Sequence, residues 1–191
     1  IGLSKAQLLA GKEVTVISTW TKEAEVLMAV TLRKAGVAVI LVGPAHGPFR
    51  RHAALRREVW QAVARADLVH IHGLWEDIQH EAASAAGQLG MPYIMRPCGM
   101  LDPWSLAHHR ARKLVYMACR LRRHLNRASA IHLTAAAECE AVARLGLLAP
   151  VVIEPLGVDL AEFDPLPEAG SFRQRHPEVA GRPFVLFVGR V

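Results

Sequence analysis

Three short segments carry side chains that could do chemistry, and each follows an apolar stretch that predicts a strand. The first is His70-Ile71-His72-Gly73-Leu74-Trp75. In a strand His70 and His72 lie on one side, Gly73 permits a tight exit, and Trp75 offers a flat face for the C–H groups of a sugar. His-x-His is also a metal-ligand spacing, but no third ligand lies nearby in the sequence. A histidine packed at a strand end and a tryptophan in the core would explain the same residues without a function.

The second segment is Arg96-Pro97-Cys98-Gly99-Met100-Leu101-Asp102-Pro103-Trp104. Pro97, Pro103 and the glycine between them predict a rigid loop. In this loop Arg96 could bind a phosphate or a carboxylate. Cys98 occupies a turn, but no base lies close to it in the sequence, which disfavours a nucleophilic thiol. A rigid turn with a surface arginine is the alternative.

The third segment runs from Thr134 to Glu138 at the start of a predicted helix. Thr134 is a suitable N-cap residue, and the Glu138 carboxylate in the first turn suits the helix dipole. Capping alone accounts for both residues, so a functional role for Glu138 stays open at this point.

The elements that must position these segments alternate along the chain. Apolar, β-branched runs predict strands, and apolar periodicity closed by glycines predicts helices. The alternation of uninterrupted apolar strands with helices predicts an α/β fold with a parallel sheet covered on both faces. Ligands of such sheets bind outside the carboxyl ends of the strands. The predicted strands cover residues 14–18, 37–42, 68–72, 92–95, 129–133 and 151–153, and the helices cover 1–10, 23–34, 55–65, 76–89, 105–127 and 135–145.

The pattern also predicts a division of the chain. Residues 1–165 form one domain, whose first strand is expected to precede Ile1. Residues 166–182, rich in proline and glycine, predict a connector. Residues 183–191 predict a buried strand that begins a second domain, because a parallel strand needs neighbours and a crossover helix. The alternative is that both end segments pack onto one domain.

The predicted helix 105–127 is basic and amphipathic. No Asp or Glu occurs between Pro103 and Ala137. An apolar stripe should face the sheet, and the basic outer face would either contact a membrane or a lipid phosphate, or be simply solvated. The stripe consists of Ala107, Ala111, Leu114, Ala118, Leu121 and Leu125, and the cations are Arg110, Arg112, Lys113, Arg120, Arg122, Arg123 and Arg127.

Composition narrows the classes of protein. Of 191 residues, 52% are hydrophobic and 21% are charged, which is enough apolar content for a core and excludes a disordered chain. The net charge of +6 favours acidic partners without choosing among them. Three cysteines without paired spacing do not form a disulfide framework, so a reducing, cytoplasmic setting is expected.

Several functional classes lack their signatures. The sequence contains no Gly-x-Gly-x-x-Gly after a strand, no P-loop and no Gly-x-Ser-x-Gly elbow. Aromatic residues make up only 6% and are scattered, which argues against a nucleic-acid partner. No apolar run approaches the roughly 20 residues of a membrane span.

Four motifs in order give the sequence a family resemblance. They are Asp67 to Trp75, Gly99 to Trp104, Pro155-Leu156-Gly157-Val158-Asp159 and Phe187-Val188-Gly189-Arg190. With these motifs the chain, from Gly11 to Val191, resembles the N-terminal part of family 4 (group 1) glycosyltransferases. The resemblance implies the Rossmann-like, acceptor-binding N-terminal half of a GT-B fold, with a sugar nucleotide bound by a second domain across a cleft.

The resemblance implies a hexosyltransferase type of enzyme in polysaccharide biosynthesis. It would transfer a sugar from a nucleotide-diphosphate donor to a saccharide or lipid-linked acceptor, with retention, no covalently bound cofactor and no protein-bound metal. The enzyme would be cytoplasmic or peripheral on the inner face of the membrane. Half of the cleft would be missing from the isolated chain, which is therefore expected to be inactive. Another GT-B enzyme, such as a nucleotide-sugar epimerase, and a non-catalytic module that binds a phosphorylated ligand are the alternatives.

The matching positions carry roles implied by the resemblance. His72 is the candidate catalytic residue. Where relatives often have Arg, Asn and Ser-Glu, this chain has Cys98, Leu156 and Ala135-Ala136, so it departs from the family pattern at these positions. The candidate acceptor-binding residues are Gly73, Trp75, Arg96, Cys98, Gly99 and Glu138, and the candidate donor-binding residues are Gly2, Gly189 and Arg190.

Overall fold

The computed structural model describes residues 2–179 and 181–187, without the side chains of residues 161 and 162. The chain divides into two compact units, residues 1–157 and residues 158–191, and each is described by itself. The predicted candidate sites within the described residues all lie in the first unit.

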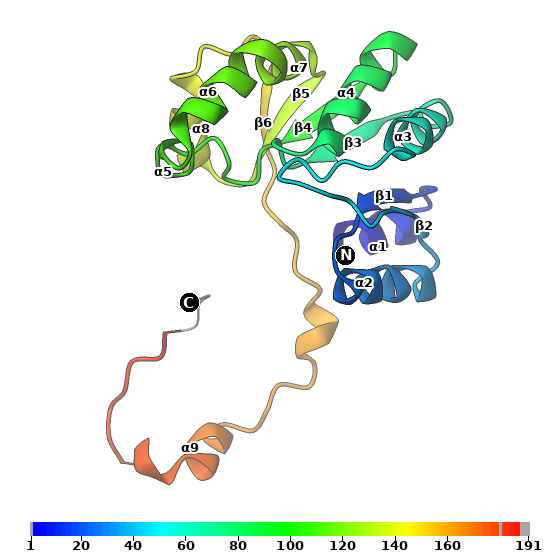
Figure 1. The fold of residues 1–191 in the computed structure, drawn as a ribbon. Helices are drawn as coiled ribbons and strands as arrows, with labels where there is room; N and C mark the ends of the chain where they lie inside the picture. Colours follow the sequence, from blue (N-terminus) through cyan, green and yellow to red (C-terminus); the bar gives the residue numbers. More distant parts are fainter. Residues whose placement is uncertain (1, 180, 188–191) are drawn as a thin grey trace. The chain divides into compact units, whose positions relative to one another are not determined.

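The first unit contains two parallel sheets (Figure 1). One sheet pairs β1 with β2, and the other has the strand order β3-β4-β5-β6. Every strand pairing is parallel, and each strand begins and ends within one residue of its predicted range. The strands are β1 (Thr15–Thr19), β2 (Ala38–Val42), β3 (Val69–His72), β4 (Tyr93–Arg96), β5 (Ala130–Leu133) and β6 (Val151–Ile153).

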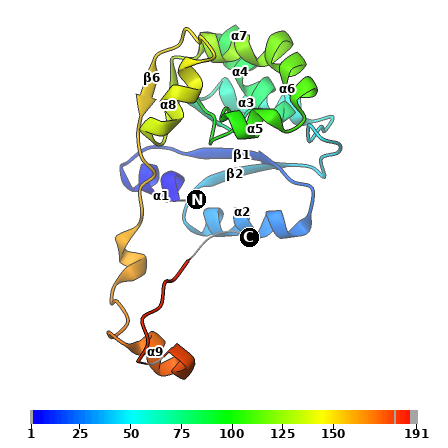
Figure 2. The same cartoon turned by 90° about the vertical axis from the view of Figure 1, so that its left-hand side faces the viewer.

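Helices flank both sheets, which confirms the predicted α/β class with parallel strands. Figure 2 shows β1 and β2 side by side with α2 along one face of them. The predicted helices recur as α1 (Gly2–Leu9), α2 (Glu23–Lys34), α3 (Leu55–Val63), α4 (Asp77–Leu89), α5 (Pro103–Ala107), α6 (Arg110–Tyr116), a π-helical segment η1 (Met117–Leu121), α7 (Arg122–Arg127) and α8 (Ala136–Ala143).

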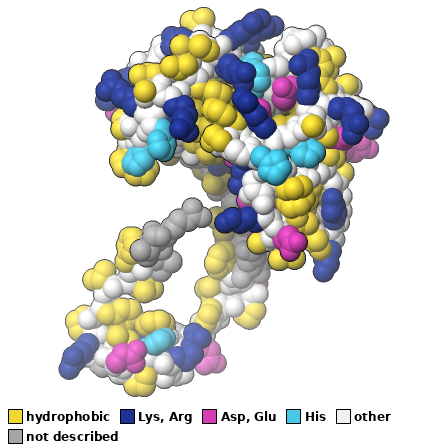
Figure 3. All heavy atoms as spheres, viewed as in Figure 1, with side chains coloured by type: hydrophobic (Ala, Val, Ile, Leu, Met, Phe, Trp, Pro, Cys, Tyr) yellow, Lys and Arg dark blue, Asp and Glu magenta, His cyan; other side chains and the backbone are white. Residues whose placement is uncertain are grey.

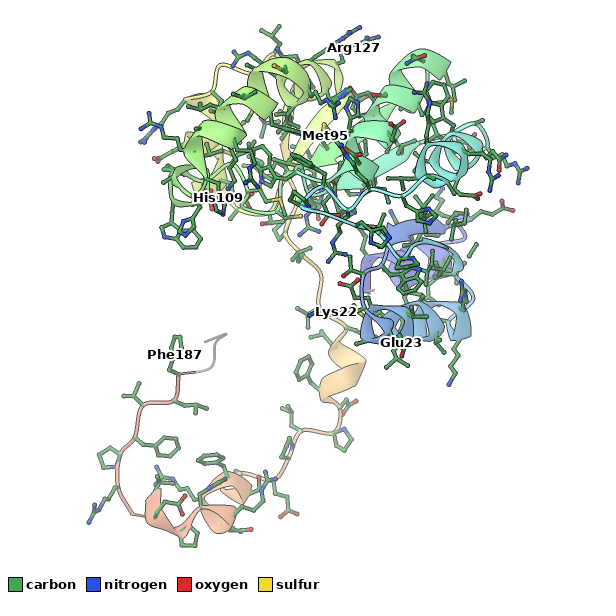
Figure 4. All side chains as sticks on the ribbon, viewed as in Figure 1. Lys22, Glu23, Met95, His109, Arg127 and Phe187 are labelled. Carbon is green, nitrogen blue, oxygen red and sulfur yellow. The ribbon has the colours of Figure 1, made fainter. Side chains whose placement is uncertain are left out.

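The two faces of the four-stranded sheet differ in chemistry. Tyr93 and Met95 of β4 are buried together with Ile71 and Ile131, their neighbours in the sheet. Figure 4 labels Met95 within this layer. Because side chains alternate across a strand, the opposite face carries Ile94 and Arg96 of β4 together with the polar residues His70, His72 and His132.

The buried face packs against α4 and the helical segments that follow β4. Leu125 of α7 and Ile131 of β5 are fully buried, and alanines of α4 let the helix approach closely. Burial of a leucine or isoleucine side chain contributes about 1.5–3 kcal/mol. This packing fixes the sheet and with it the positions at which the strands end.

The predicted helix 105–127 is wrong as a single element. It is interrupted at His108 and His109, where His109 has a left-handed backbone with φ of 54°. The π-helical segment η1 then shifts the register again. Leu121 and Leu125 are buried as predicted, but Leu114 of the same predicted stripe is 57% exposed. Ala107, Ala111 and Ala118 of that stripe are exposed as well.

The segment between β2 and α3 is joined to two helices. Arg50 forms ion pairs with Glu25 at 2.9 Å and with Glu76 at 3.2 Å. The backbone N–H of Asp77 donates to the Phe49 carbonyl at 2.8 Å. These contacts connect α2, this segment and the start of α4, and they hold Phe49 beside the helices.

The second unit contains short helical segments. They are η2 (Leu160–Phe163), α9 (Ser171–Arg175) and η3 (Pro177–Val179). Residues 183–187, the described part of the predicted strand, are not assigned to a strand. Residues 188–191 lie outside the described residues, and the predicted domain boundaries stay predictions. None of the described helices is long and apolar enough to cross a membrane.

Candidate functional site

The carboxyl ends of β3, β4 and β5 form one edge of the four-stranded sheet. His72 ends β3 and Arg96 ends β4, and these two residues are direct partners in the sheet register. The first two predicted segments are therefore brought together by parallel pairing. The third segment follows β5 at the same edge.

His72 and Arg96 also contact each other through their side chains. Nη1 of Arg96 lies 3.3 Å from Nδ1 of His72. Arginine can only donate, so Nδ1 of His72 accepts and the neutral ring carries its hydrogen on Nε2. His72 therefore offers an N–H donor at the edge, where its side chain remains exposed.

A second pair of histidines extends this cluster across the sheet. Nε2 of His70 lies 3.2 Å from Nδ1 of His132, whose Nε2 lies 2.9 Å from the Glu154 carbonyl. Since a carbonyl accepts, His132 carries its hydrogen on Nε2 and receives one from His70. The rings of His70 and His72 are 4.3 Å apart. His132 was not among the predicted site residues, although its place one residue before a predicted strand end was a usable signal.

Both histidines of β3 are held neutral near pH 7. Burial, followed by the charges of His132 and Arg96, lowers the pKa of His70 to about 4. Desolvation, followed by His70 and Arg96, lowers the pKa of His72 to about 4. At neutral pH His70 and His72 consequently add no positive charge to that of Arg96.

Arg96 has unused hydrogen-bonding capacity. Its Nε is buried and has no hydrogen-bond partner among the described residues. The following residue pair, Pro97 and Cys98, turns the chain sharply, with Cys98 at φ of 56° and its thiol exposed. Arg96 is thus a guanidinium at a strand end that can take an anion or a hydroxyl.

The loop after β3 is fixed by Gly73 and Gln79. Gly73 has φ of 81°, and a Cβ there would lie 3.1 Å from Nε2 of Gln79. That amide donates to the His72 carbonyl at 3.1 Å, and its Oε1 accepts from the Glu76 N–H at 2.8 Å. The positive φ favours glycine here, and a Cβ would press on the end of the Gln79 side chain, which agrees with the predicted tight exit.

Trp75 is partly packed against α6. Its ring makes an edge contact with Tyr116 at 5.9 Å, and Nζ of Lys113 lies 5.3 Å from its ring centroid. Its Nε1 is buried without a hydrogen-bond partner among the described residues. The ring therefore sits between the core and a cation, so it is less open than a free stacking platform.

Glu138 bonds within its own segment. Its carboxylate accepts from the N–H of Thr134 at 3.2 Å and from the Thr134 hydroxyl. The N-cap residue is Ala135, so the predicted cap at Thr134 is wrong by one position. These contacts hold Glu138 to Thr134 without a side-chain cap of the helix, and no contact joins Glu138 to His72 or Arg96 among the described interactions.

The remaining candidates are dispersed. Gly2 is the first residue of α1 and has open space around it. Gly99 has φ of 73° and faces the Asp102 carboxylate, so it shapes the turn after β4. Gly189 and Arg190 lie outside the described residues. Among the described side chains, no three or more of His, Cys, Asp and Glu are grouped to hold a metal ion.

A search of solved structures found similarity to a Burkholderia thailandensis nucleoside kinase in complex with inosine, with 14% identity and a TM-score of 0.48. The match covers 75% of this chain and 50% of that one, so it spans about half of the kinase. No curated protein matches the chain. The model of the glycosyl transferase 4-like domain matches residues 2–157. The chain therefore belongs to the glycosyl transferase 4-like domain family.

Proposed function

We propose that this chain is the acceptor-side part of an enzyme that transfers a sugar from a nucleotide-diphosphate donor to a saccharide or lipid-linked acceptor, with retention. The family match over residues 2–157 supports a glycosyltransferase. The observation that carries the site is the contact between Arg96 and His72 at the carboxyl edge of the sheet. Parallel α/β sheets bind their ligands at this edge.

The proposed transfer needs protein groups that stabilise the leaving diphosphate and protein groups that position the acceptor substrate. Negative charge develops on the leaving diphosphate, which cations and N–H groups must stabilise. Arg190 is the proposed donor-side cation. On the acceptor side the Nε2–H of neutral His72 donates a hydrogen bond to an oxygen of the acceptor substrate, and Arg96 orients the ring through Nδ1. His72 would then position the attacking hydroxyl.

The proposed setting is the cytoplasm or the inner face of the membrane. The segment 105–127 carries seven Lys and Arg residues and no acidic residue. Such a segment is attracted to anionic lipid. Peripheral contact through it is consistent with a lipid-linked acceptor and with a polysaccharide precursor assembled at the membrane.

A transfer assay tests the proposal. The full gene product is incubated with UDP-, GDP-, ADP- and dTDP-sugars and an extract of cellular acceptors, and products are followed by mass spectrometry and by the NMR coupling of the new anomeric proton. We expect one donor to give a product with retained configuration. His72→Ala should reduce transfer by about 100-fold or more, as removal of a positioned polar group does. Arg57→Ala, which removes an exposed arginine on α3, is the matched control.

The outcomes separate the alternatives. A change of the sugar within the donor, without transfer to any acceptor, would identify an epimerase. Donor binding by calorimetry without turnover would identify a binding module. Inversion at the anomeric carbon would contradict the retaining mechanism. The chain of residues 1–191 alone is expected to give no product.

A further inference from the structure

A third histidine lies beside the two histidines of β3. His132 is the third residue of β5, and its strand neighbours Ile131 and Leu133 are fully buried. Because successive side chains of a strand point to opposite faces, His132 lies on the face of the sheet that also carries His70 and His72. Its side chain is partly buried there. The candidate site therefore contains a third histidine next to its predicted residues.

Both ring nitrogens of His132 are engaged. Its Nε2 donates to the Glu154 carbonyl at 2.9 Å, and its Nδ1 accepts from Nε2 of His70 at 3.2 Å. Glu154 is itself held, because its N–H donates to the Leu133 carbonyl at 2.9 Å and so extends the pairing of β5 with β6. Rotation of the His132 ring would break both of its hydrogen bonds. The ring is therefore a fixed acceptor for His70.

The hydrogen bond to His132 holds His70 in turn. The centroid of the His70 ring lies 5.2 Å from that of His132 and 4.3 Å from that of His72, and the planes of His70 and His72 are tilted by 36°. At the shorter distance the two rings are in van der Waals contact. A change in the orientation of His70 would therefore move the surface on which the ring of His72 lies.

Arg96 alone does not fix the ring of His72. Nη1 of Arg96 lies 3.3 Å from Nδ1 of His72, whereas strong charge-assisted hydrogen bonds are about 2.7–2.9 Å long. A single long hydrogen bond lets the ring pivot around it. The contact with His70 supplies a second point of support. The direction in which the Nε2–H of His72 points therefore depends on both neighbours.

Core packing does not require histidines at these positions. Ile94 of β4 is the register partner of His70, so an apolar side chain is accommodated on the same face. Desolvation, followed by the charge of His132, lowers the pKa of His70 to about 4, so the ring is neutral near pH 7. A neutral hydrogen bond contributes only about 0.5–1.5 kcal/mol, which burial of an apolar pair would match. The position of the pair beside His72 explains its polarity better than stability does.

From these contacts we infer that His132 and His70 are positioning residues of the proposed transfer. His132 holds His70, and His70 supports the ring of His72 in the orientation in which its Nε2–H meets the hydroxyl of the acceptor substrate. Neither residue touches the substrate, and no bond forms or breaks at them. This inference rests on the proposed function and extends the site by two residues behind His72.

Kinetics of the full gene product test the inference. Transfer is measured with the nucleotide sugars and the acceptor extract of the assay above, over a dilution series of the extract. In His132→Leu the maximal rate should fall about 10-fold, because a small misplacement of a reacting group has an effect of this order or larger. The extract concentration that gives half of the maximal rate should change less than about twofold, because the contacts with the substrate remain.

The effect of His132 should disappear when His72 is absent. His72→Ala, His132→Leu should transfer no more slowly than His72→Ala alone, because the effects of residues that act through one another do not add. His132→Asn should keep at least about a third of the parent's maximal rate, because its side-chain oxygen can still accept from His70.

A second histidine pair provides the matched control. Nδ1 of His80 lies 2.9 Å from Nε2 of His124, both side chains are partly buried, and no described interaction joins this pair to His72 or Arg96. His124→Leu should therefore keep the maximal rate to within about twofold, even where it lowers the Tm. Figure 3 shows histidine side chains (cyan) at a few places on the visible face of the first unit, and the exposed His46 offers a second control as His46→Leu.

Imidazole NMR of the chain gives a readout that needs no substrate. Long-range proton–nitrogen spectra distinguish the two neutral tautomers of a histidine. Near neutral pH, His70, His72 and His132 should each carry their hydrogen on Nε2. In His132→Leu the signals of both His70 and His72 should shift, whereas in His124→Leu they should stay as in the parent.

Several results would overturn the inference. Unchanged His72 signals in His132→Leu would do so, and so would equal losses of rate in His132→Leu and His124→Leu. A double variant slower than His72→Ala, or a His132→Asn as slow as His132→Leu, would also contradict it. Transfer by the parent that His132→Leu leaves unaffected would reject this inference and leave the proposed function standing. No transfer by the parent from any donor would reject the proposed function and, with it, the positioning role.

Discussion

Nη1 of Arg96 lies 3.3 Å from Nδ1 of His72, so the last residues of two neighbouring strands meet side chain to side chain. The contact fixes which nitrogen of His72 carries the hydrogen. It also places the only charge of the pair on Arg96, because the pKa of His72 is lowered to about 4.

The charge of Arg96 should be measurable through His72. In Arg96→Gln the nearby cation is lost, so the pKa of His72 should rise toward its ordinary value of 6.5 while remaining lowered by desolvation and His70. An NMR titration of the imidazole signals gives the value. Arg57→Gln should leave it unchanged, and an unaltered pKa in Arg96→Gln would contradict the contact.

Acid should destabilise the fold through the pair His80 and His124. Nδ1 of His80 lies 2.9 Å from Nε2 of His124, and burial is the first cause that lowers both pKa values, that of His124 to about 4. The unfolded chain takes up protons near pH 6.5 and the folded chain does not. The contribution of this pair to the free energy of unfolding is therefore full above pH 6.5 and declines as the pH falls from 6.5 toward 4.

Thermal unfolding at pH 7.5 and pH 5 measures this decline. The drop in Tm between the two pH values should be smaller in His80→Leu, His124→Leu than in the parent, because that variant has no proton to gain at this pair. Equal drops in both proteins would show that the pair does not contribute.

The loop after β3 should require glycine at position 73. In Gly73→Ala the strained φ of 81° and the close approach to Gln79 should lower the free energy of unfolding by about 1–3 kcal/mol. Gly87→Ala is the matched change within α4, where the nearest atoms are 3.8 Å away. It should be neutral or stabilise by up to about 1 kcal/mol, because alanine favours helix. Urea unfolding gives both values, and a Gly73→Ala as stable as the parent would exclude the strain.

Truncation of two leucines in the segment after β4 should change the free energy of unfolding by very different amounts. Leu125→Ala removes a fully buried side chain and should cost about 2–5 kcal/mol. Leu114→Ala removes a side chain that is 57% exposed and should change stability by no more than about 0.5 kcal/mol. Urea unfolding measures both, and similar losses would contradict the interrupted helix.

The sequence by itself determined the elements and their class. Apolar runs and turn residues predicted each strand of the first unit within one residue of its observed bounds, because period and turn chemistry are local properties. The strand predicted over 183–191 is not found in its described residues 183–187. The same local signals predicted that His72 ends a strand and that Arg96 directly follows one, and the family resemblance agreed with the family model that matches residues 2–157.

Only the tertiary structure decided how these residues meet. The register of β3, β4 and β5 brings His132 to His70 across an intervening strand, and no local pattern encodes that pairing. The helix predicted over 105–127 is likewise interrupted at His108 and His109, and Leu114 is exposed. Phe49 stacks on Tyr116 of α6 with ring centroids 5.7 Å apart, which is a contact between segments far apart in the chain. Local sequence sets the conformation of each element, whereas burial and charge pairing between elements set the site.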